Sequence, residues 1–244
     1  MKLLIDIGNT RIKYLLMQDN QLFDASEVKH LDYHLLSQAL SSEEFSKVSV
    51  VIVASVQSHE NVSVIESWAL AGNIKFLQVH SQSKAYGVSS RYQQPEQLGV
   101  DRWLALIAAR QLYPASNVLI IDAGTAITID LLGKDGQHQG GWIMPGIQTM
   151  FDSLLNNTQK VIAEQDTVES LPFGDSTSQC VNYGIWAMAI GAINNAIEQA
   201  NKTLTLDQIL LTGGNSQQIA RLMPNNYKLI PELLFHGLSC FRDS

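Results

Sequence analysis

The chain has 244 residues, of which 45% are hydrophobic, so it is long enough to fold around one large core or two smaller ones. Its formal net charge of −7 argues against nucleic acid or an anionic membrane as the main partner, because both need a basic surface. The two distant cysteines, Cys180 and Cys240, indicate neither a disulfide framework nor a zinc site. Since the sequence also shows no signal-peptide pattern and no apolar stretch of membrane-spanning length, we expect a soluble cytoplasmic protein.

The N-terminal stretch MKLLIDIGNTRIKYLL predicts a β-hairpin. Residues 3–5 form its first buried strand, Gly8-Asn9 its turn and residues 12–16 its returning strand. The pattern recurs as NVLIIDAGTAITIDLL, which places a second Asp-x-Gly turn at Asp122, 116 residues after Asp6. A repeat at nearly half the chain length indicates an internal duplication.

The segments between the two turns alternate between strand and helix patterns. We expect strands within 47–56 and 74–79 and a helix over 58–71. A polar segment, 80–98, precedes a helix that begins near Gly99 or Asp101 and ends before Pro114.

The second half repeats this alternation. Its predicted elements are strands at 117–122, 126–132 and 138–143, a helix with Pro145 at its first position, a long helix over 176–200, and a strand that runs through Gly213-Gly214 into a helix. The predicted fold is therefore α/β, with two related domains, 1–114 and 115–244, facing each other across a cleft.

The paired Asp-x-Gly turns predict a phosphate site. A glycine after a strand-end carboxylate lets a phosphate approach the backbone, and Asn9 and Thr10 add side-chain donors. A carboxylate next to a phosphate needs a cation between them, which indicates Mg²⁺. One such hairpin alone is commonly structural, but the second copy favours function. The sequence has neither a P-loop nor a strand-linked G-x-G-x-x-G motif, so other nucleotide-binding classes are not supported.

Further candidate residues occur in LGVDRW, GGWIMPG and LLTGGNS. Asp101 either stabilises a helix N-terminus or acts as a general base, with Arg102 beside it for an anionic group. GGWIMPG either exposes backbone N–H groups to an anion or a carbonyl or is only a packed corner between a strand and a helix. LLTGGNS either lets a flat nucleotide base lie close to the backbone or is only a tight turn from a strand to a helix. His30 and His34 have the spacing of a metal pair, but their segment lacks the Glu of H-E-x-x-H, which argues against a metal site.

Five motifs, in this order, span nearly the whole chain: DIGNT, YQQPEQLGVDR, DAGTAIT, GGWIMPG and STSQCVNYGIW. With them the sequence resembles type III pantothenate kinase. The resemblance implies the actin-like ATPase fold, a duplicated ribonuclease-H-like domain, and a homodimer. It also implies ATP-dependent phosphorylation of pantothenate to 4′-phosphopantothenate, the first step of coenzyme A synthesis, with Mg²⁺ and a monovalent cation, K⁺ or NH₄⁺.

The resemblance also implies roles for individual residues. The ATP and phosphate contacts are Asp6, Ile7, Gly8, Asn9, Thr10, Arg11 and Thr125, with Mg²⁺ held at Asp6 through the phosphates. Lys13 is a further phosphate contact predicted only from its position after the turn. Asp101 is the implied proton acceptor and Asp122 the implied monovalent-cation ligand. The implied pantothenate pocket consists of Tyr92, Gly99, Val100, Asp101, Arg102 and Thr177. Tyr92 and Thr177 rest on the resemblance alone, and Gln94 replaces the Asn often found before the proline of the substrate loop.

Two other functions share some of these features. Another actin-like enzyme, such as a sugar kinase or a polyphosphate-type phosphohydrolase, has the paired turns but does not need the GVDR loop. A nucleotide-binding regulator is the second alternative. The acidic net charge, the absence of a helix-turn-helix pattern and the presence of Asp101 argue against it.

Overall fold

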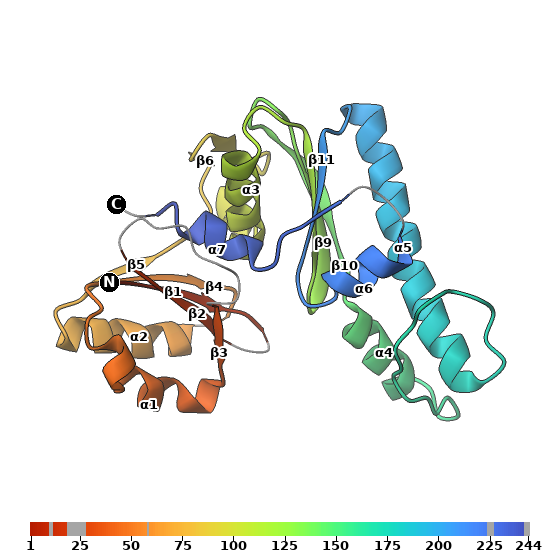
Figure 1. Ribbon diagram of the computed structural model, residues 1–244, viewed down its shortest axis with the longest axis horizontal. Helices are drawn as coiled ribbons and strands as arrows, with labels where there is room; N and C mark the ends of the chain where they lie inside the picture. The colour runs from red at the N-terminus through yellow and green to blue at the C-terminus, as the bar shows by residue number, and fades with distance from the viewer. Residues whose placement is uncertain (10–11, 19–27, 58, 224–226, 242–244) are drawn as a thin grey trace. The chain divides into compact units, whose positions relative to one another are not determined.

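The computed structural model describes residues 1–9, 12–18, 28–57, 59–223 and 227–241 (Figure 1). Contacts divide the chain into two compact units, unit 1 with Met1–Leu112 and the segment from Glu232 onward, and unit 2 with Tyr113–Pro231. The chain first passes from unit 1 to unit 2 between Leu112 and Tyr113, close to the predicted boundary at residue 114. The prediction that the second domain runs to residue 244 differs from this division, because the C-terminal segment packs with unit 1.

Unit 1 contains a five-stranded sheet in the order β3-β2-β1-β4-β5. Its strands are β1 (Lys2–Ile7), β2 (Ile12–Met17), β3 (Lys29–Leu31), β4 (Val50–Ser55) and β5 (Lys75–Gln78). The predicted N-terminal hairpin is confirmed, since β1 pairs with β2 in antiparallel orientation. On its other side, β1 pairs with β4 in parallel orientation. The central strands form because their β-branched and leucine side chains are buried on both faces of the sheet.

Helices cover both faces of this sheet (Figure 1). On one face, α1 (Leu36–Leu40) and α2 (His59–Ala71) share a buried core with Leu3, Ile5 and Ile7. On the other face, α3 (Val100–Leu112) packs closely on α7 (Leu233–Leu238). A Cβ added at Gly237 of α7 would lie only 2.1 Å from the carbonyl oxygen of Leu104, so the close approach of the two helices requires glycine there.

The polar segment before α3 is part of unit 1. It contains a short hairpin, β6 (Lys84–Ala85) and β7 (Val88–Ser89), and a 3₁₀ helix, Pro95–Gln97. The hydroxyl of Ser81 donates a hydrogen bond of 2.7 Å to the carbonyl oxygen of Leu98. This bond fixes the backbone directly before the start of α3, where the predicted substrate residues lie.

Unit 2 repeats the sheet of unit 1 with the order β10-β9-β8-β11-β12 and the same strand directions. Its strands are β8 (Val118–Ala123), β9 (Ala126–Leu132), β10 (His138–Pro145), β11 (Gln208–Thr212) and β12 (Lys228–Leu229). Asp6 and Asp122 are each the fifth residue of the first strand of their sheet. The structure therefore confirms the duplicated α/β architecture that the paired turns predicted.

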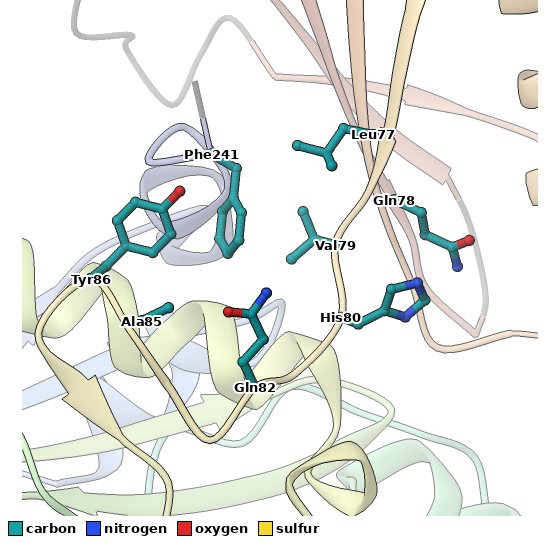
Figure 2. A pocket seen from close by; sticks show the side chains of 8 residues that line it. All are labelled: Leu77, Gln78, Val79, His80, Gln82, Ala85, Tyr86 and Phe241. Atoms are coloured by element: carbon teal, nitrogen blue, oxygen red, sulfur yellow. The ribbon is translucent and has the colours of Figure 1, made fainter. Parts of the chain in front are cut away.

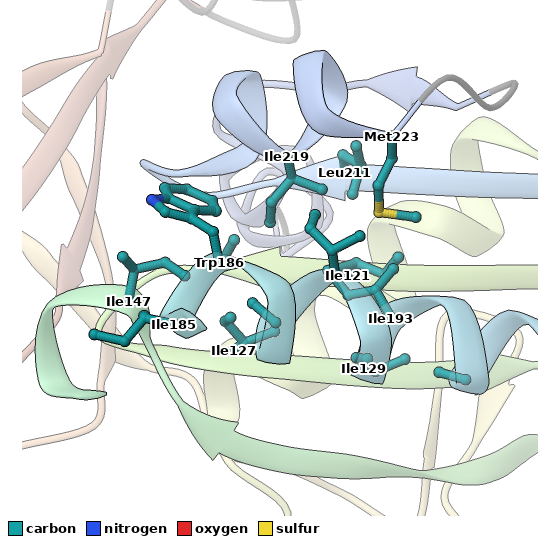
Figure 3. Close-up of a cluster of buried hydrophobic side chains, with 14 of the residues drawn as sticks. Ile121, Ile127, Ile129, Ile147, Ile185, Trp186, Ile193, Leu211, Ile219 and Met223 are labelled. Atoms are coloured by element: carbon teal, nitrogen blue, oxygen red, sulfur yellow. The ribbon is translucent and has the colours of Figure 1, made fainter. Parts of the chain in front are cut away.

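The described residues of unit 2 also form three helices: α4 (Ile147–Asn156), α5 (Thr177–Thr203) and α6 (Ser216–Leu222). In Figure 3, Ile185, Trp186 and Ile193 of α5 pack among the isoleucines of β8 and β9. The prediction that Pro145 is the first residue of a helix is wrong, because β10 extends through Pro145 and Gly146 is the N-cap of α4. Among the described residues, no helix combines the length and the apolar character that crossing a membrane requires.

Candidate functional site

The first Asp-x-Gly turn lies at the carboxyl end of β1. Leu3, Ile5 and Ile7 point into the core with α1 and α2, so the intervening Asp6 lies on the opposite face, the face covered by α3 and α7. Asp6 is directly opposite Lys13 of β2, and such opposed residues share a face. The structure thus places a carboxylate and an ammonium side by side at the turn. The side chain of Ile7 is fully buried, which leaves only its backbone for a ligand.

Neighbouring side chains hold the backbone of this turn. The Tyr33 hydroxyl donates a hydrogen bond to the carbonyl oxygen of Gly8, and the amide of Gln57 donates to the carbonyl oxygen of Asn9 at 3.1 Å. Burial, and to a lesser extent the negative charge of Asp6, raises the pKa of Tyr33 above its usual value of 10.0. Tyr33 therefore remains a hydrogen-bond donor at neutral pH. The predicted contacts Thr10 and Arg11 lie outside the described residues.

Neither Tyr33 nor Gln57 was predicted from the sequence, because both reach the turn from other elements. Tyr33 belongs to a 3₁₀ helix after β3, and Gln57 follows β4. The only sequence signal for Gln57 is its place just after a buried strand parallel to β1, since the ends of parallel strands meet at one edge of the sheet.

Five predicted substrate residues, Tyr92 and residues 99–102, come together at the N-terminus of α3. The Asp101 carboxylate turns back over Gly99, and its Oδ1 accepts a hydrogen bond of 2.7 Å from the backbone N–H of Arg102. The Arg102 side chain is buried, with 4% of its surface exposed. Its Nη1 donates to the hydroxyl of Tyr92 at 2.9 Å, and its guanidinium carbon lies 5.8 Å from the centre of the Tyr92 ring.

This arrangement can hold an anionic group beside a proton acceptor. A buried guanidinium whose fork is fixed by an aromatic hydroxyl is suited to bind a carboxylate. The partly exposed Asp101 directly precedes Arg102 in the same helical turn. Val100, the first residue of α3, is almost fully buried, so its side chain packs in the protein interior and supports the helix start.

The second Asp-x-Gly turn, in unit 2, is enclosed by two glycine-containing segments. Leu119, Ile121 and Ala123 face the core with α5, so Asp122 lies on the other face, between Thr128 of β9 and Thr212 of β11. A Cβ at Gly213 would lie 2.3 Å from Asp122 Oδ1, and Gly213 has a φ of +86°, so only glycine fits this close approach.

The Thr125 carbonyl oxygen connects this turn to α4. It accepts hydrogen bonds from the N–H of Gly146 at 2.9 Å and from the hydroxyl of Thr149 at 2.8 Å. The motifs DAGT, MPG and TGG, which the sequence suggested separately, therefore form one cluster of turns. In this cluster of turns, the group suited to bind a hard cation is the Asp122 carboxylate.

Thr177 is the exposed first residue of α5, and Ser176 caps that helix by accepting a hydrogen bond of 3.3 Å from the Gln179 N–H. Within the described part of the chain, no group of three or more His, Cys, Asp or Glu side chains is placed to hold a metal ion. The Asp6 carboxylate fits Mg²⁺ that arrives with nucleotide phosphates, because this ion keeps most of its waters and needs few protein ligands.

Unit 1 also contains a cavity of about 280 Å³ that none of the predicted site residues line (Figure 2). The Tyr86 and Phe241 rings meet edge to face at its border, with centroids 4.7 Å apart. Its lining residues include the polar residues Gln78, His80, Gln82 and Tyr86.

Comparisons with known proteins show the family of this chain. The sequence model of the family "Type III pantothenate kinase" matches residues 2–199. A type III pantothenate kinase of Colwellia psychrerythraea is 41% identical over 248 aligned residues, which cover 98% of each chain.

Two solved structures share the fold. One is a Campylobacter jejuni protein named as a Baf family transcriptional activator, with a TM-score of 0.62, 24% identity, and coverage of 98% of this chain and 96% of that one. The other is a Sinorhizobium meliloti protein named as a 2-dehydro-3-deoxygalactonokinase, with a TM-score of 0.60, 12% identity, and coverage of 98% and 97%. At these identities the likeness concerns the fold alone, which is the actin-like ATPase fold of two ribonuclease-H-like domains. Because the family model and the Colwellia relative both cover most of the sequence, the chain belongs to the type III pantothenate kinase family.

Proposed function

We propose that Asp101 is the proton acceptor in the reaction of this family, the ATP-dependent phosphorylation of pantothenate to 4′-phosphopantothenate, which begins coenzyme A synthesis. The observation that carries the proposal is the placement of Asp101 beside Arg102 at the start of α3. The backbone N–H of Arg102 orients the carboxylate, while Tyr92 fixes the neighbouring guanidinium.

Each residue at the start of α3 has a separate task in this proposal. Arg102 binds the pantothenate carboxylate, and Tyr92 keeps the guanidinium fork in the orientation that this requires. Asp101 accepts the proton of the primary hydroxyl as the hydroxyl oxygen attacks the γ-phosphorus and the bond to the β–γ bridging oxygen breaks. Gly99 leaves the space that the carboxylate occupies. Thr177 is proposed as a further pantothenate contact on the basis of the motif alone.

The two Asp-x-Gly turns are proposed to hold the nucleotide and its cations. In unit 1, the turn from Asp6 to Arg11, together with Lys13, contacts the phosphates. Mg²⁺, which neutralises charge on the phosphates, would be held at Asp6. In unit 2, Thr125 contacts phosphate and Asp122 binds the monovalent cation, K⁺ or NH₄⁺. A carboxylate beside a phosphate repels it unless a cation lies between them, so we expect activity to require both cations.

We further propose that the protein acts as a homodimer in the cytoplasm. The acidic net charge and the absence of a basic patch in the sequence support a small-molecule role rather than one in nucleic-acid binding.

The proposal is tested by ADP release from ATP and Mg²⁺ with and without pantothenate, in potassium, ammonium and sodium buffers. We expect release that requires pantothenate and is faster in potassium or ammonium than in sodium. Equal pantothenate-dependent release in all three buffers would contradict the role of Asp122 and leave that of Asp101 intact. Release with a sugar but not with pantothenate would favour the sugar-kinase alternative, and tight ATP binding without release for any acceptor would favour the regulator.

A further inference from the structure

Glu232 lies where the chain returns from unit 2 to unit 1. It is the N-cap of α7, with a left-handed backbone (φ 57°, ψ 35°) that non-glycine residues rarely adopt. Its carbonyl oxygen accepts a hydrogen bond of 2.9 Å from the N–H of Phe235. Such a conformation persists only where the surroundings hold the residue in place.

The Glu232 side chain contacts the hairpin that carries the first Asp-x-Gly turn. Its Oε2 lies 2.8 Å from Nζ of Lys13, although the two residues are 219 positions apart in the sequence. Only 26% of the Lys13 side chain and 19% of the Glu232 side chain are exposed. This ion pair is therefore better shielded from water than the Lys29–Glu44 pair of the same unit, whose side chains are 60% and 32% exposed.

The position of Lys13 gives this ion pair its significance. Lys13 lies directly opposite Asp6, on the face of the sheet that carries the proposed phosphate site. An ammonium group has three donors but a single compact charge, so a carboxylate and a phosphate compete for it. The carboxylate of Glu232 presents to Lys13 the same chemistry as a nucleotide phosphate, namely anionic oxygen acceptors.

We propose that Glu232 is a positioning residue: its carboxylate binds the Lys13 ammonium while no nucleotide is bound. When ATP binds, the ammonium moves from Glu232 to the phosphates. The inference rests on the phosphate-binding role proposed for Lys13. Its consequence is that Glu232 competes with the nucleotide: each binding event must first break the ion pair. Nucleotide affinity is therefore lower than the phosphate contacts alone would give.

The test is direct binding of ATP and of ADP to the full-length protein by calorimetry, comparing wild type with Glu232→Gln and Glu232→Asn. Both substitutions remove the charge, and asparagine also tolerates the left-handed backbone. Because a partly exposed ion pair is weak, we expect the Kd for each nucleotide to fall about two- to fivefold. The matched control is Glu44→Gln, which breaks the Lys29 pair and is expected to leave both Kd values unchanged.

The same measurements in a Lys13→Met background separate competition from a general structural effect. Lys13→Met alone is expected to weaken nucleotide binding about ten- to a hundredfold, as for the loss of a charge-assisted contact. In that background the Glu232 substitutions should have no further effect.

Three results would overturn the inference. If Lys13→Met weakens binding but the Glu232 substitutions leave Kd unchanged or raise it, the inference alone is wrong. If the Glu232 substitutions tighten binding equally with Lys13 or Met at position 13, Glu232 acts without Lys13 and the exchange does not occur. If Lys13→Met leaves the affinity unchanged, both the inference and the proposed role of Lys13 are contradicted, while the assignment of Asp101 is unaffected.

Discussion

Replacing Gly99 by alanine moves the Asp101 carboxylate without changing its chemistry. A Cβ at position 99 would lie 2.5 Å from Asp101 Oδ1, whereas ordinary van der Waals contact begins at 3.4 Å. The carboxylate must therefore shift by about 1 Å, which disturbs its hydrogen bond with the N–H of Arg102. A misplacement of this size in a reacting group costs about a hundredfold in rate.

The stability of the variant should change little. The atom that clashes is the end of a flexible side chain, and Gly99 is not among the glycines with a positive φ. The backbone can therefore stay in place, and we expect the free energy of unfolding to change by less than about 1 kcal/mol.

Steady-state kinetics of ADP release, together with urea unfolding, test this prediction. We expect kcat to fall about hundredfold, with an unfolding free energy close to that of the wild type. The control is Gly191→Ala in the middle of α5, where an added Cβ meets no atom within 4 Å and activity should be unchanged. A wild-type kcat for Gly99→Ala would refute the argument that the position of the Asp101 carboxylate limits the reaction.

Three further predictions concern other contacts. Tyr92→Phe removes the 2.9 Å hydrogen bond from Arg102 Nη1 but keeps the ring, so the KM for pantothenate should rise about three- to tenfold with kcat nearly unchanged in steady-state assays. Gly237→Ala forces a Cβ against the Leu104 backbone, so the free energy of unfolding in urea should fall by at least about 2 kcal/mol. Burial lowers the pKa of His236 below 6.5, so the unfolded state binds its proton at a higher pH than the folded state does. The stability that follows from this difference is present above pH 6.5 and is lost as the pH falls towards the folded-state pKa. His236→Gln should therefore weaken the pH dependence of the unfolding free energy, measured by urea unfolding between about pH 5 and 7.

Much of the fold could be predicted because its signals are local. Runs of β-branched residues mark the central strands, and the two Asp-x-Gly turns mark the start of each sheet. The start of α3 at Val100 was predicted to within one residue, since Gly99 and Asp101 suit a helix N-terminus.

The features that could not be predicted depend on contacts between distant residues. α7 is six residues long, and its place in unit 1 depends on how closely Gly237 packs against Leu104. Pro145 was misplaced because it can end an edge strand as well as begin a helix. In the structure it ends β10, and the contact of Gly146 with Thr125 sets the start of α4.

The site shows the same division between local and distant signals. Asp6, Asp101 and Asp122 were predicted as site residues from their turns and from the helix start, and their roles remain predictions. Tyr33, which helps to hold the first turn, carries no local pattern that distinguishes it from other polar residues, and Gln57 has only its place just after a buried strand. A single sequence cannot reveal such supporting contacts, because they arise only when separate elements pack together.

The most direct test of the proposed mechanism is the turnover number of Asp101→Asn for pantothenate-dependent ADP release, measured beside the wild type in potassium buffer with saturating ATP and Mg²⁺. Asparagine keeps the shape of the side chain but cannot accept the proton. We predict that kcat falls by about two to four orders of magnitude, the usual effect of losing a general base, while pantothenate binding is largely retained. A kcat equal to that of the wild type would remove Asp101 from the reaction and contradict the central claim.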